Sequence, residues 1–206
     1  MAFTLPKIYP ITDTLISGLS HAEQIKLLAA GGASLIQLRE KKASPREFYE
    51  AAREAMLIGR RLGVRIIIND RVDIAIAVGA DGVHLGQDDL PPDRVRSLLG
   101  EGPIIGFSTH TLEQALAADS APVDYVAIGP VFHTSTKEKP DAVVGLEALS
   151  EIKRRISKPL VAIGGVTLDR ARSVIASGAD SVAIISDLLS TGDITERTRA
   201  LAGLLR

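Results

Sequence analysis

The sequence has 206 residues, which is long enough for one domain with a substantial buried core. Hydrophobic residues make up 46% of it but aromatic residues only 3%, so the core must consist mainly of Ala, Val, Ile and Leu. The formal net charge of −1 and the lack of tryptophan argue against a broad basic surface with stacking aromatic rings, so we expect no nucleic acid partner and no membrane partner.

Cysteine is absent from the sequence, which excludes disulfides, thiolate metal sites and cysteine nucleophiles. The first residues, MAFTLPKIYPIT, lack the basic and apolar segments of a secretory signal, and no apolar run reaches membrane-spanning length. We therefore expect a cytoplasmic protein. No linker, low-complexity tract or block of charge divides the sequence, so we expect one catalytic domain over residues 1–206.

Short β-type runs alternate with helical patterns from one end of the chain to the other. The predicted strands are Lys7–Thr12, Ser34–Leu38, Arg65–Asn69, Gly82–Leu85, Ile104–Ser108, Tyr125–Ile128, Leu160–Ile163 and Ser181–Ile185. Helical periodicity covers His21–Ala30, Pro45–Leu62, Pro91–Leu99, Leu112–Ala118, Leu146–Arg155, Leu168–Ala176 and Ile194–Leu205, with a further helix beginning near Arg71. Ser20 and Glu23 form a predicted capping box, and Ser44-Pro45 begins the next helix.

A weak internal sequence repeat supports this alternation. Glycine and a small or acidic residue precede an apolar strand in GGASLIQL, GADGVHLG and SGADSVAII, with a fainter version in PVDYVAIG. Eight such units predict the α/β class and a (β/α)₈ TIM barrel. An open doubly wound sheet is the alternative, although no G-x-G-x-x-G follows the first strand. In a barrel, the polar residues at the carboxyl ends of the strands carry the chemistry.

Hydrogen-bond donors follow the second predicted strand. Gln37, Arg39 and Lys41 alternate along the segment QLREK, so strand geometry directs them to one side, toward the barrel mouth. Two cations and an amide on one side suit a multiply charged anion such as diphosphate. A solvated basic turn paired with Glu40 is the simpler alternative.

Carboxylates follow the third and fourth predicted strands. Asp70 comes directly after Asn69, and Asp89 ends the segment LGQDD. Neighbouring strands of a barrel bring such residues together, and two carboxylates with few other protein ligands are typical of Mg²⁺, which completes its shell with water and phosphate oxygens. Either carboxylate could instead cap the helix that follows it, and Asp88 is the alternative to Asp89 as a ligand.

Two histidines and a serine lie at or near the fourth and fifth strand ends. Ser108 ends the fifth predicted strand and can donate a hydrogen bond to phosphate. His110 is expected to be a surface or helix-start residue, and His84 a packed barrel histidine. Thr109 and Thr111 are candidates for the helix cap.

The last three strands end in segments that suit phosphate. Residues 129–140 are long for a loop of this type, and their hydroxyls and Lys137 suit a binding loop, although a mobile hydrophilic loop would have similar residues. Gly164-Gly165 after the seventh strand allows close approach of the backbone, so this turn and the end of the eighth strand predict a phosphate cradle.

Six segments in barrel order, QLREK, NDRVDIA, GADGVHLGQDD, GFSTHT, DYVAIGPVFHTSTK and VAIGGVT, resemble the thiamine phosphate synthase family over essentially the whole chain. The resemblance implies a transferase that joins 4-amino-2-methyl-5-(diphosphooxymethyl)pyrimidine to 4-methyl-5-(2-phosphooxyethyl)thiazole, or its carboxylated form, and releases diphosphate. It implies two small phosphorylated substrates and the cofactor Mg²⁺, and it leaves a homodimer open as the assembly state.

The resemblance also implies a role for each matching residue. The pyrimidine diphosphate would be bound by Gln37, Arg39, Lys41, Asn69, Ser108 and Lys137. The thiazole phosphate would be bound by Thr134, Ser135, Thr136, Gly165, Ile185 and Ser186. Mg²⁺ would be bound by Asp70 and Asp89. The catalytic residues would be Arg39, Lys41, Ser108 and Lys137, and the cations among them would offset the charge of the leaving diphosphate.

Two other functions are open at this point. The related thiazole tautomerase shares the fold and the phosphate cradle, but the resemblance places its catalytic histidine at Pro130 of this chain. A non-catalytic phosphate-binding barrel is the alternative from another class, although nothing in the sequence marks a basic or apolar partner surface.

Overall fold

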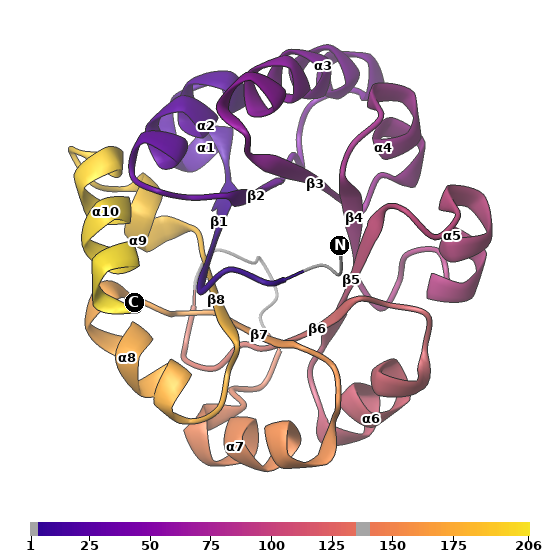
Figure 1. Ribbon diagram of the computed structural model, residues 1–206, viewed down its shortest axis with the longest axis vertical. Helices are drawn as coiled ribbons and strands as arrows, with labels where there is room; N and C mark the ends of the chain where they lie inside the picture. Colours follow the sequence, from indigo (N-terminus) through magenta and orange to yellow (C-terminus); the bar gives the residue numbers. More distant parts are fainter. Residues whose placement is uncertain (1–3, 135–140) are drawn as a thin grey trace.

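The computed structural model describes residues 4–134 and 141–206. Eight parallel strands close into a barrel in the order β1 to β8, and helices form an outer ring around it (Figure 1). The strands are β1 (Ile8–Thr12), β2 (Leu35–Leu38), β3 (Arg65–Asn69), β4 (Gly82–Leu85), β5 (Ile104–Thr109), β6 (Tyr125–Ile128), β7 (Leu160–Ile163) and β8 (Ser181–Ile184). The predicted (β/α)₈ barrel is confirmed, and the doubly wound alternative is wrong.

The helices of the ring follow the strands along the chain. They are α1 (Thr14–Ser17), α2 (His21–Ala30), α3 (Pro45–Leu62), α4 (Val72–Val78), α5 (Pro92–Leu99), α6 (Leu112–Ser120), α7 (Gly145–Arg155), α8 (Leu168–Ala176), α9 (Ser186–Leu189) and α10 (Ile194–Leu204). Both predicted helix starts are confirmed, because Ser20 and Ser44 each form a capping box. None of the helices in the described ranges is both long and apolar enough to cross a bilayer.

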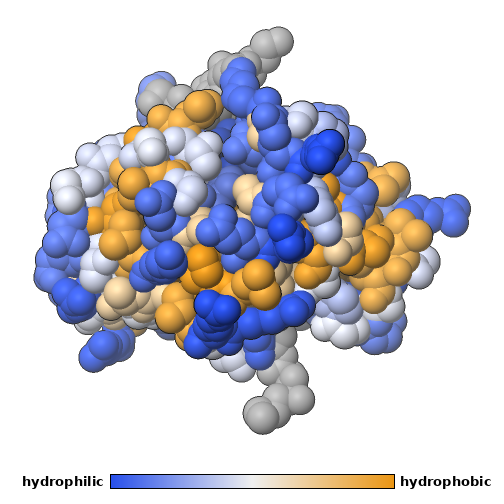
Figure 2. Space-filling view, turned by 90° about the horizontal axis from the view of Figure 1, so that it is seen from above, coloured by the Kyte–Doolittle hydropathy of each residue, from blue (hydrophilic) through white to orange (hydrophobic). Residues whose placement is uncertain are grey.

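The core has two layers, which strand alternation separates. Along β2, Ile36 and Leu38 face outward and pack with the helices, whereas Leu35 belongs to a second cluster inside the barrel. Two tyrosines, Tyr9 and Tyr125, are the largest side chains of the inner cluster. On the face in Figure 2, hydrophobic residues lie in small groups between hydrophilic ones.

The internal sequence repeat has a structural cause at the amino ends of the strands. An aspartate directly before each of β4, β6 and β8 accepts a hydrogen bond from a backbone amide at the beginning of the preceding strand. The pairs are Asp81 with Ile66 at 2.8 Å, Asp124 with Ile105 at 2.7 Å, and Asp180 with Leu160 at 2.8 Å. The remaining copy of the repeat, GGASLIQL, has Ser34 at the corresponding position. Each aspartate therefore links two neighbouring strands.

We expect Asp180→Ala to lower the free energy of unfolding by about 1–3 kcal/mol, because the Leu160 amide loses its acceptor and the Lys153 ammonium, 2.6 Å from Asp180, loses its carboxylate partner. Urea unfolding measures the change. The exposed Glu54→Ala on α3 is the control and should leave the free energy of unfolding within about 0.5 kcal/mol. Equal stability of both variants would show that the aspartate contributes nothing.

The sequence pattern misses α1 and α9, which have four residues each and are too short for helical periodicity to be visible. β8 ends at Ile184 rather than Ile185, so Ile185 becomes the cap of α9 and Ser186 its first residue. β5 continues one residue beyond the prediction, to Thr109.

Candidate active site

A cavity of 520 Å³ lies at the carboxyl ends of the strands, and its lining comes from every strand or from the segment that follows it. Ten of the predicted site residues line it: Arg39, Lys41, Asn69, Asp70, Asp89, Ser108, Thr134, Gly165, Ile185 and Ser186. Ser135, Thr136 and Lys137 lie outside the described residues. The positions of the ten match the rim that the sequence predicts.

Among the predicted site residues that the structure describes, Gln37 is the one that is not part of this lining. Its side chain is buried inside the barrel, and Nε2 donates a hydrogen bond to the Tyr9 hydroxyl at 3.1 Å. The alternation of side chains along the strand correctly predicts that Gln37 points to the inside of the barrel. It does not reveal that Gln37 lies one layer below the mouth. Its role in substrate binding stays a prediction.

The two cations at the mouth have carboxylate partners. Arg39 forms an ion pair with Asp13, which caps α1 by accepting hydrogen bonds from two backbone amides. Lys41 Nζ lies 2.5 Å from Asp70 Oδ2. The alternative of a basic turn paired with Glu40 is wrong, because the Glu40 carboxylate instead accepts hydrogen bonds from the backbone amides of its own turn.

Asp13 is a site residue that the sequence reasoning misses. Its carboxylate is buried and holds the Arg39 guanidinium beside the cavity. The local signal is its place directly after β1, followed by a helix start, which is the position of an N-cap aspartate. The contact with Arg39 is not a local one and has no signal in the sequence.

The two predicted metal ligands occupy neighbouring loops. Asp70 has a left-handed backbone with φ 62°, and its amide donates to the His84 carbonyl at 2.8 Å. Asp89 accepts a hydrogen bond from the Gly86 amide at 2.6 Å. Neither carboxylate caps a helix, because α4 and α5 have no side-chain cap, so the capping alternative is wrong for both.

The electrostatics of Asp89 show how close the two carboxyls are. Burial raises the pKa of the Asp89 carboxyl, and the nearby Asp70 carboxylate raises it further, although the hydrogen bond from Gly86 opposes the change. Two carboxylates that share one edge of the cavity repel each other, so this edge favours a cation between them. Asp88 also lines the cavity, and it stays an alternative ligand.

The floor of the cavity is polar but neutral. His84 is buried, stacks on Tyr125 and lies 2.8 Å from Ser108, so the prediction of a packed barrel histidine is confirmed. Burial lowers the pKa of the His84 imidazole to about 4, against the opposing effect of Asp70. The ring is therefore neutral near neutral pH.

The glycine turn after β7 forms the opposite side of the cavity. Gly164 and Gly165 have φ values of 95° and 63°, which favour glycine. A Cβ on Gly164 would lie 2.5 Å from Pro130 Cβ, and one on Gly165 would lie 2.5 Å from the His133 carbonyl oxygen. The two glycines therefore allow this turn to pack closely against the segment after β6, and the phosphate cradle that the sequence predicts here stays a prediction.

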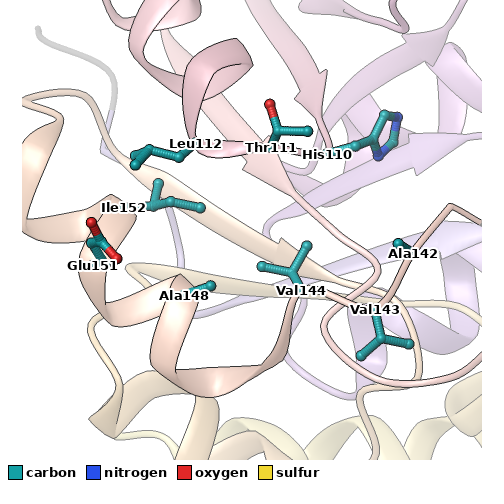
Figure 3. Close-up of a pocket in the computed structure, with 9 residues that line it drawn as sticks. All are labelled: His110, Thr111, Leu112, Ala142, Val143, Val144, Ala148, Glu151 and Ile152. Atoms are coloured by element: carbon teal, nitrogen blue, oxygen red, sulfur yellow. The ribbon is translucent and has the colours of Figure 1, made fainter.

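His110 lies directly before the cap of α6, as the helix-start half of its prediction has it, and its side chain is only partly exposed. Its Nδ1 lies 2.6 Å from the Gly129 carbonyl oxygen, and its side chain also lines the cavity. A smaller cavity of 160 Å³ between the beginning of α6 and α7 shares His110, with Leu112, Val144 and Ile152 around it (Figure 3). Thr111, one of the two predicted candidates, is the cap of α6.

Together, the carboxylate edge, the two cations and the glycine turn form a strand-end site typical of an enzyme of the (β/α)₈ class. The family described as thiamine monophosphate synthase matches residues 8–188. The chain is 44% identical over 199 residues to the thiamine-phosphate synthase of Clostridium novyi, covering 96% of this chain and 98% of that protein. It is 49% identical over 194 residues to the thiamine-phosphate synthase of Koribacter versatilis, covering 90% of each.

A solved structure agrees with these relatives. The thiamine phosphate pyrophosphorylase from Pyrococcus furiosus is similar with a TM-score of 0.88 and 37% identity, covering 97% of this chain and 95% of that one. The chain belongs to the thiamine monophosphate synthase family. It is a transferase that forms thiamine phosphate, as the resemblance of its strand-end segments implies.

Proposed function

We propose that the barrel mouth binds the pyrimidine diphosphate on its Arg39–Lys41 and Asp70–Asp89 side and the thiazole phosphate on the side of Gly165 and Ser186. The observation that carries this division is the placement of cations and carboxylates on one edge of a single cavity and a glycine turn on the other. In this arrangement the thiazole nitrogen attacks the pyrimidine methylene carbon, and the bond from that carbon to the diphosphate oxygen breaks.

The residues at the carboxylate edge fit Mg²⁺. No group of three or more His, Asp or Glu side chains that could hold a metal occurs within residues 4–134 and 141–206. Asp70 and Asp89 therefore suit an ion that takes few protein ligands and completes its shell with water and phosphate oxygens. When bound, such an ion offsets negative charge on the diphosphate, and Lys41, already beside Asp70, adds to that effect.

The remaining rim residues bind and orient the substrates. Arg39 is fixed by Asp13, so its guanidinium is positioned before the substrate arrives. Ser108 faces the cavity from β5, and Asn69 from the end of β3. Thr134 and Ser186 would donate to the thiazole phosphate. Alignment of two substrates in one enclosed cavity lowers the entropic part of the barrier, and no protein nucleophile is required.

The direct test is an assay with both phosphorylated precursors and Mg²⁺, followed for thiamine phosphate and free diphosphate. Formation of both products in equal amounts is expected, with loss of the reaction when Mg²⁺ is removed. Titration calorimetry with the pyrimidine diphosphate is the second measurement. Binding that is the same with and without Mg²⁺ would contradict the metal assignment but not the family.

We expect Lys41→Ala to weaken binding of the pyrimidine diphosphate about 10-fold and to leave binding of the thiazole phosphate nearly unchanged, because the lost ammonium lies on the carboxylate edge. Calorimetry of each substrate alone measures both constants. Lys42→Ala, at a neighbouring exposed lysine that is not part of the cavity lining, is the control. Equal losses for both substrates would contradict the division of the mouth.

A further inference from the structure

A carboxylate behind the cavity wall joins the two loops on the glycine side of the cavity. Asp187, the second residue of α9, accepts a hydrogen bond at Oδ2 from the amide of Leu168, the first residue of α8, at 3.1 Å. Leu168 comes three residues after Gly165, and Asp187 directly follows Ser186. Gly165 and Ser186 line the cavity, whereas Asp187 does not. The contact therefore joins the loop after β7 to the loop after β8.

The beginning of α8 depends on this contact. Thr167 is at the cap position of α8, but its side chain makes no capping hydrogen bond. The first amides of a helix have no partner within the helix, so the Leu168 amide takes an acceptor from elsewhere. Asp187 supplies that acceptor from the next loop. A cap formed by Thr167 itself would leave the two loops independent of each other, whereas the cap formed by Asp187 makes their positions depend on one another.

An arginine from a third helix fixes the Asp187 carboxylate. Arg197 of α10 donates from Nη2 to Oδ1 at 2.7 Å and from Nε to Oδ2 at 3.1 Å. The α10 helix packs against both α8 and α9. Two hydrogen bonds from one guanidinium fix both the position and the orientation of a carboxylate. The Asp187 side chain is only 12% exposed, so solvent screens this pair less than an ion pair on the surface.

The charge of Arg197 has a second effect at this side of the cavity. A lone carboxylate directly after Ser186 would repel an anion bound beside Ser186, because like charges raise the energy of binding. Arg197 offsets the charge of Asp187 while leaving its hydrogen bond to the Leu168 amide in place. The pair therefore joins the two loops without adding net negative charge behind the cavity.

We propose that Asp187 and Arg197 are positioning residues, which hold Gly165 and Ser186 at the separation that the thiazole phosphate requires. This inference rests on the proposed function for the division of the mouth into two sides. Neither Asp187 nor Arg197 belongs to the cavity lining, so both act through the loops that they join. The carboxylate edge follows β3 and β4 on the other side, so the pair affects binding of one substrate and not of both.

Kinetics with each substrate varied in turn test this division of effects. Asp187→Ala should raise KM for the thiazole phosphate about 10-fold and leave kcat and KM for the pyrimidine diphosphate within about 2-fold. Arg197→Met keeps the acceptor of the Leu168 amide, so it serves as a second variant if Asp187→Ala does not fold, and its KM should change in the same direction. Arg197→Lys should recover part of the loss, because it restores the charge. In the double variant, KM should rise by less than the product of the two single rises, because both substitutions break the same link.

Two control variants separate positioning from stability and from loss of charge. Asp180 also accepts a hydrogen bond from a backbone amide and pairs with a cation, but it lies at the amino ends of the strands. Asp180→Ala should therefore lower Tm and leave both KM values unchanged. Glu196 pairs with Arg199 on α10, and both side chains are more than half exposed. Glu196→Ala should change neither Tm nor KM, because a surface ion pair contributes little.

Amide hydrogen exchange tests the link between the loops without any substrate. The Leu168 amide should exchange slowly in the unchanged protein and at least about 10-fold faster in Asp187→Ala, but not in Asp180→Ala.

Two results would overturn the proposal. One is a KM for the thiazole phosphate that stays unchanged in Asp187→Ala although exchange of the Leu168 amide becomes faster. The other is an equal rise of both KM values in Asp187→Ala. Failure of the proposed function gives a different pattern, in which Lys41→Ala weakens binding of both substrates equally while the Leu168 amide still responds to Asp187→Ala.

Discussion

Replacing Asp70 or Asp89 by asparagine is expected to lower kcat by about 10²- to 10³-fold, which makes these the substitutions with the largest effect on the reaction. Each removes one negative charge from the edge where the two carboxylates lie together. Asparagine is the right replacement at position 70, because its φ of 62° is tolerated by asparagine far better than by alanine. Turnover is measured over a range of Mg²⁺ concentrations.

Asp73→Asn is the matched control for this experiment. Its carboxylate is exposed at the beginning of α4 and pairs with Arg71, only three residues from Asp70 but outside the cavity lining. We expect its kcat to stay close to that of the unchanged protein. Asp88→Asn belongs in the same series, since a large loss there would move the ligand from Asp89 to Asp88. Normal turnover in both the Asp70 and Asp89 variants would show that these two carboxylates are not needed for the reaction.

The substitution with the largest expected effect on stability is Gly106→Ala. An added Cβ would lie 2.0 Å from Tyr125 Cζ, and the ring it meets is fully buried. The ring must move within a packed interior, so we expect the free energy of unfolding to fall by about 1–3 kcal/mol or more. We also expect kcat to fall, because the Tyr125 hydroxyl would leave its place beside His84.

Chemical unfolding and kinetics of the same preparation measure both effects of Gly106→Ala. Gly102→Ala is the control, because a Cβ there meets no atom within 4 Å. Combining Gly106→Ala with Tyr125→Leu should return part of the lost stability but none of the lost activity. If Gly106→Ala alone leaves the free energy of unfolding unchanged, the Tyr125 ring can move aside to accommodate the added methyl group, and the expected clash is wrong.

The fold could be predicted because each strand is a short aliphatic run with a turn residue before it. β3 (Arg65–Asn69), β4 (Gly82–Leu85), β6 (Tyr125–Ile128) and β7 (Leu160–Ile163) have the predicted bounds. The observed ends of β5 and β8 differ by one residue from the predicted ends. Whether the last residue of a strand forms ladder hydrogen bonds depends on the neighbouring strand and not on the local sequence. Barrel closure itself is a contact between the first and last strands.

The rim of the site could be predicted because barrel geometry places strand ends together. Asp70 and Lys41 are a clear example, since they come from different strands and lie within hydrogen-bond distance. What the sequence does not show is the partner of each side chain. The Arg39–Asp13 pair and the contact of Tyr9 with Tyr125, 116 residues apart, depend on the three-dimensional packing of the barrel.

The aspartates before β4, β6 and β8 have a consequence for how this barrel can change over time. They act at the amino ends of the strands, whereas the cavity is built at the carboxyl ends. The residues that stabilise the barrel and the residues that select the substrate therefore lie at opposite ends of the same strands. Replacement of rim residues can alter specificity while the scaffold stays reinforced, so we regard this barrel as a tolerant starting point for new substrates.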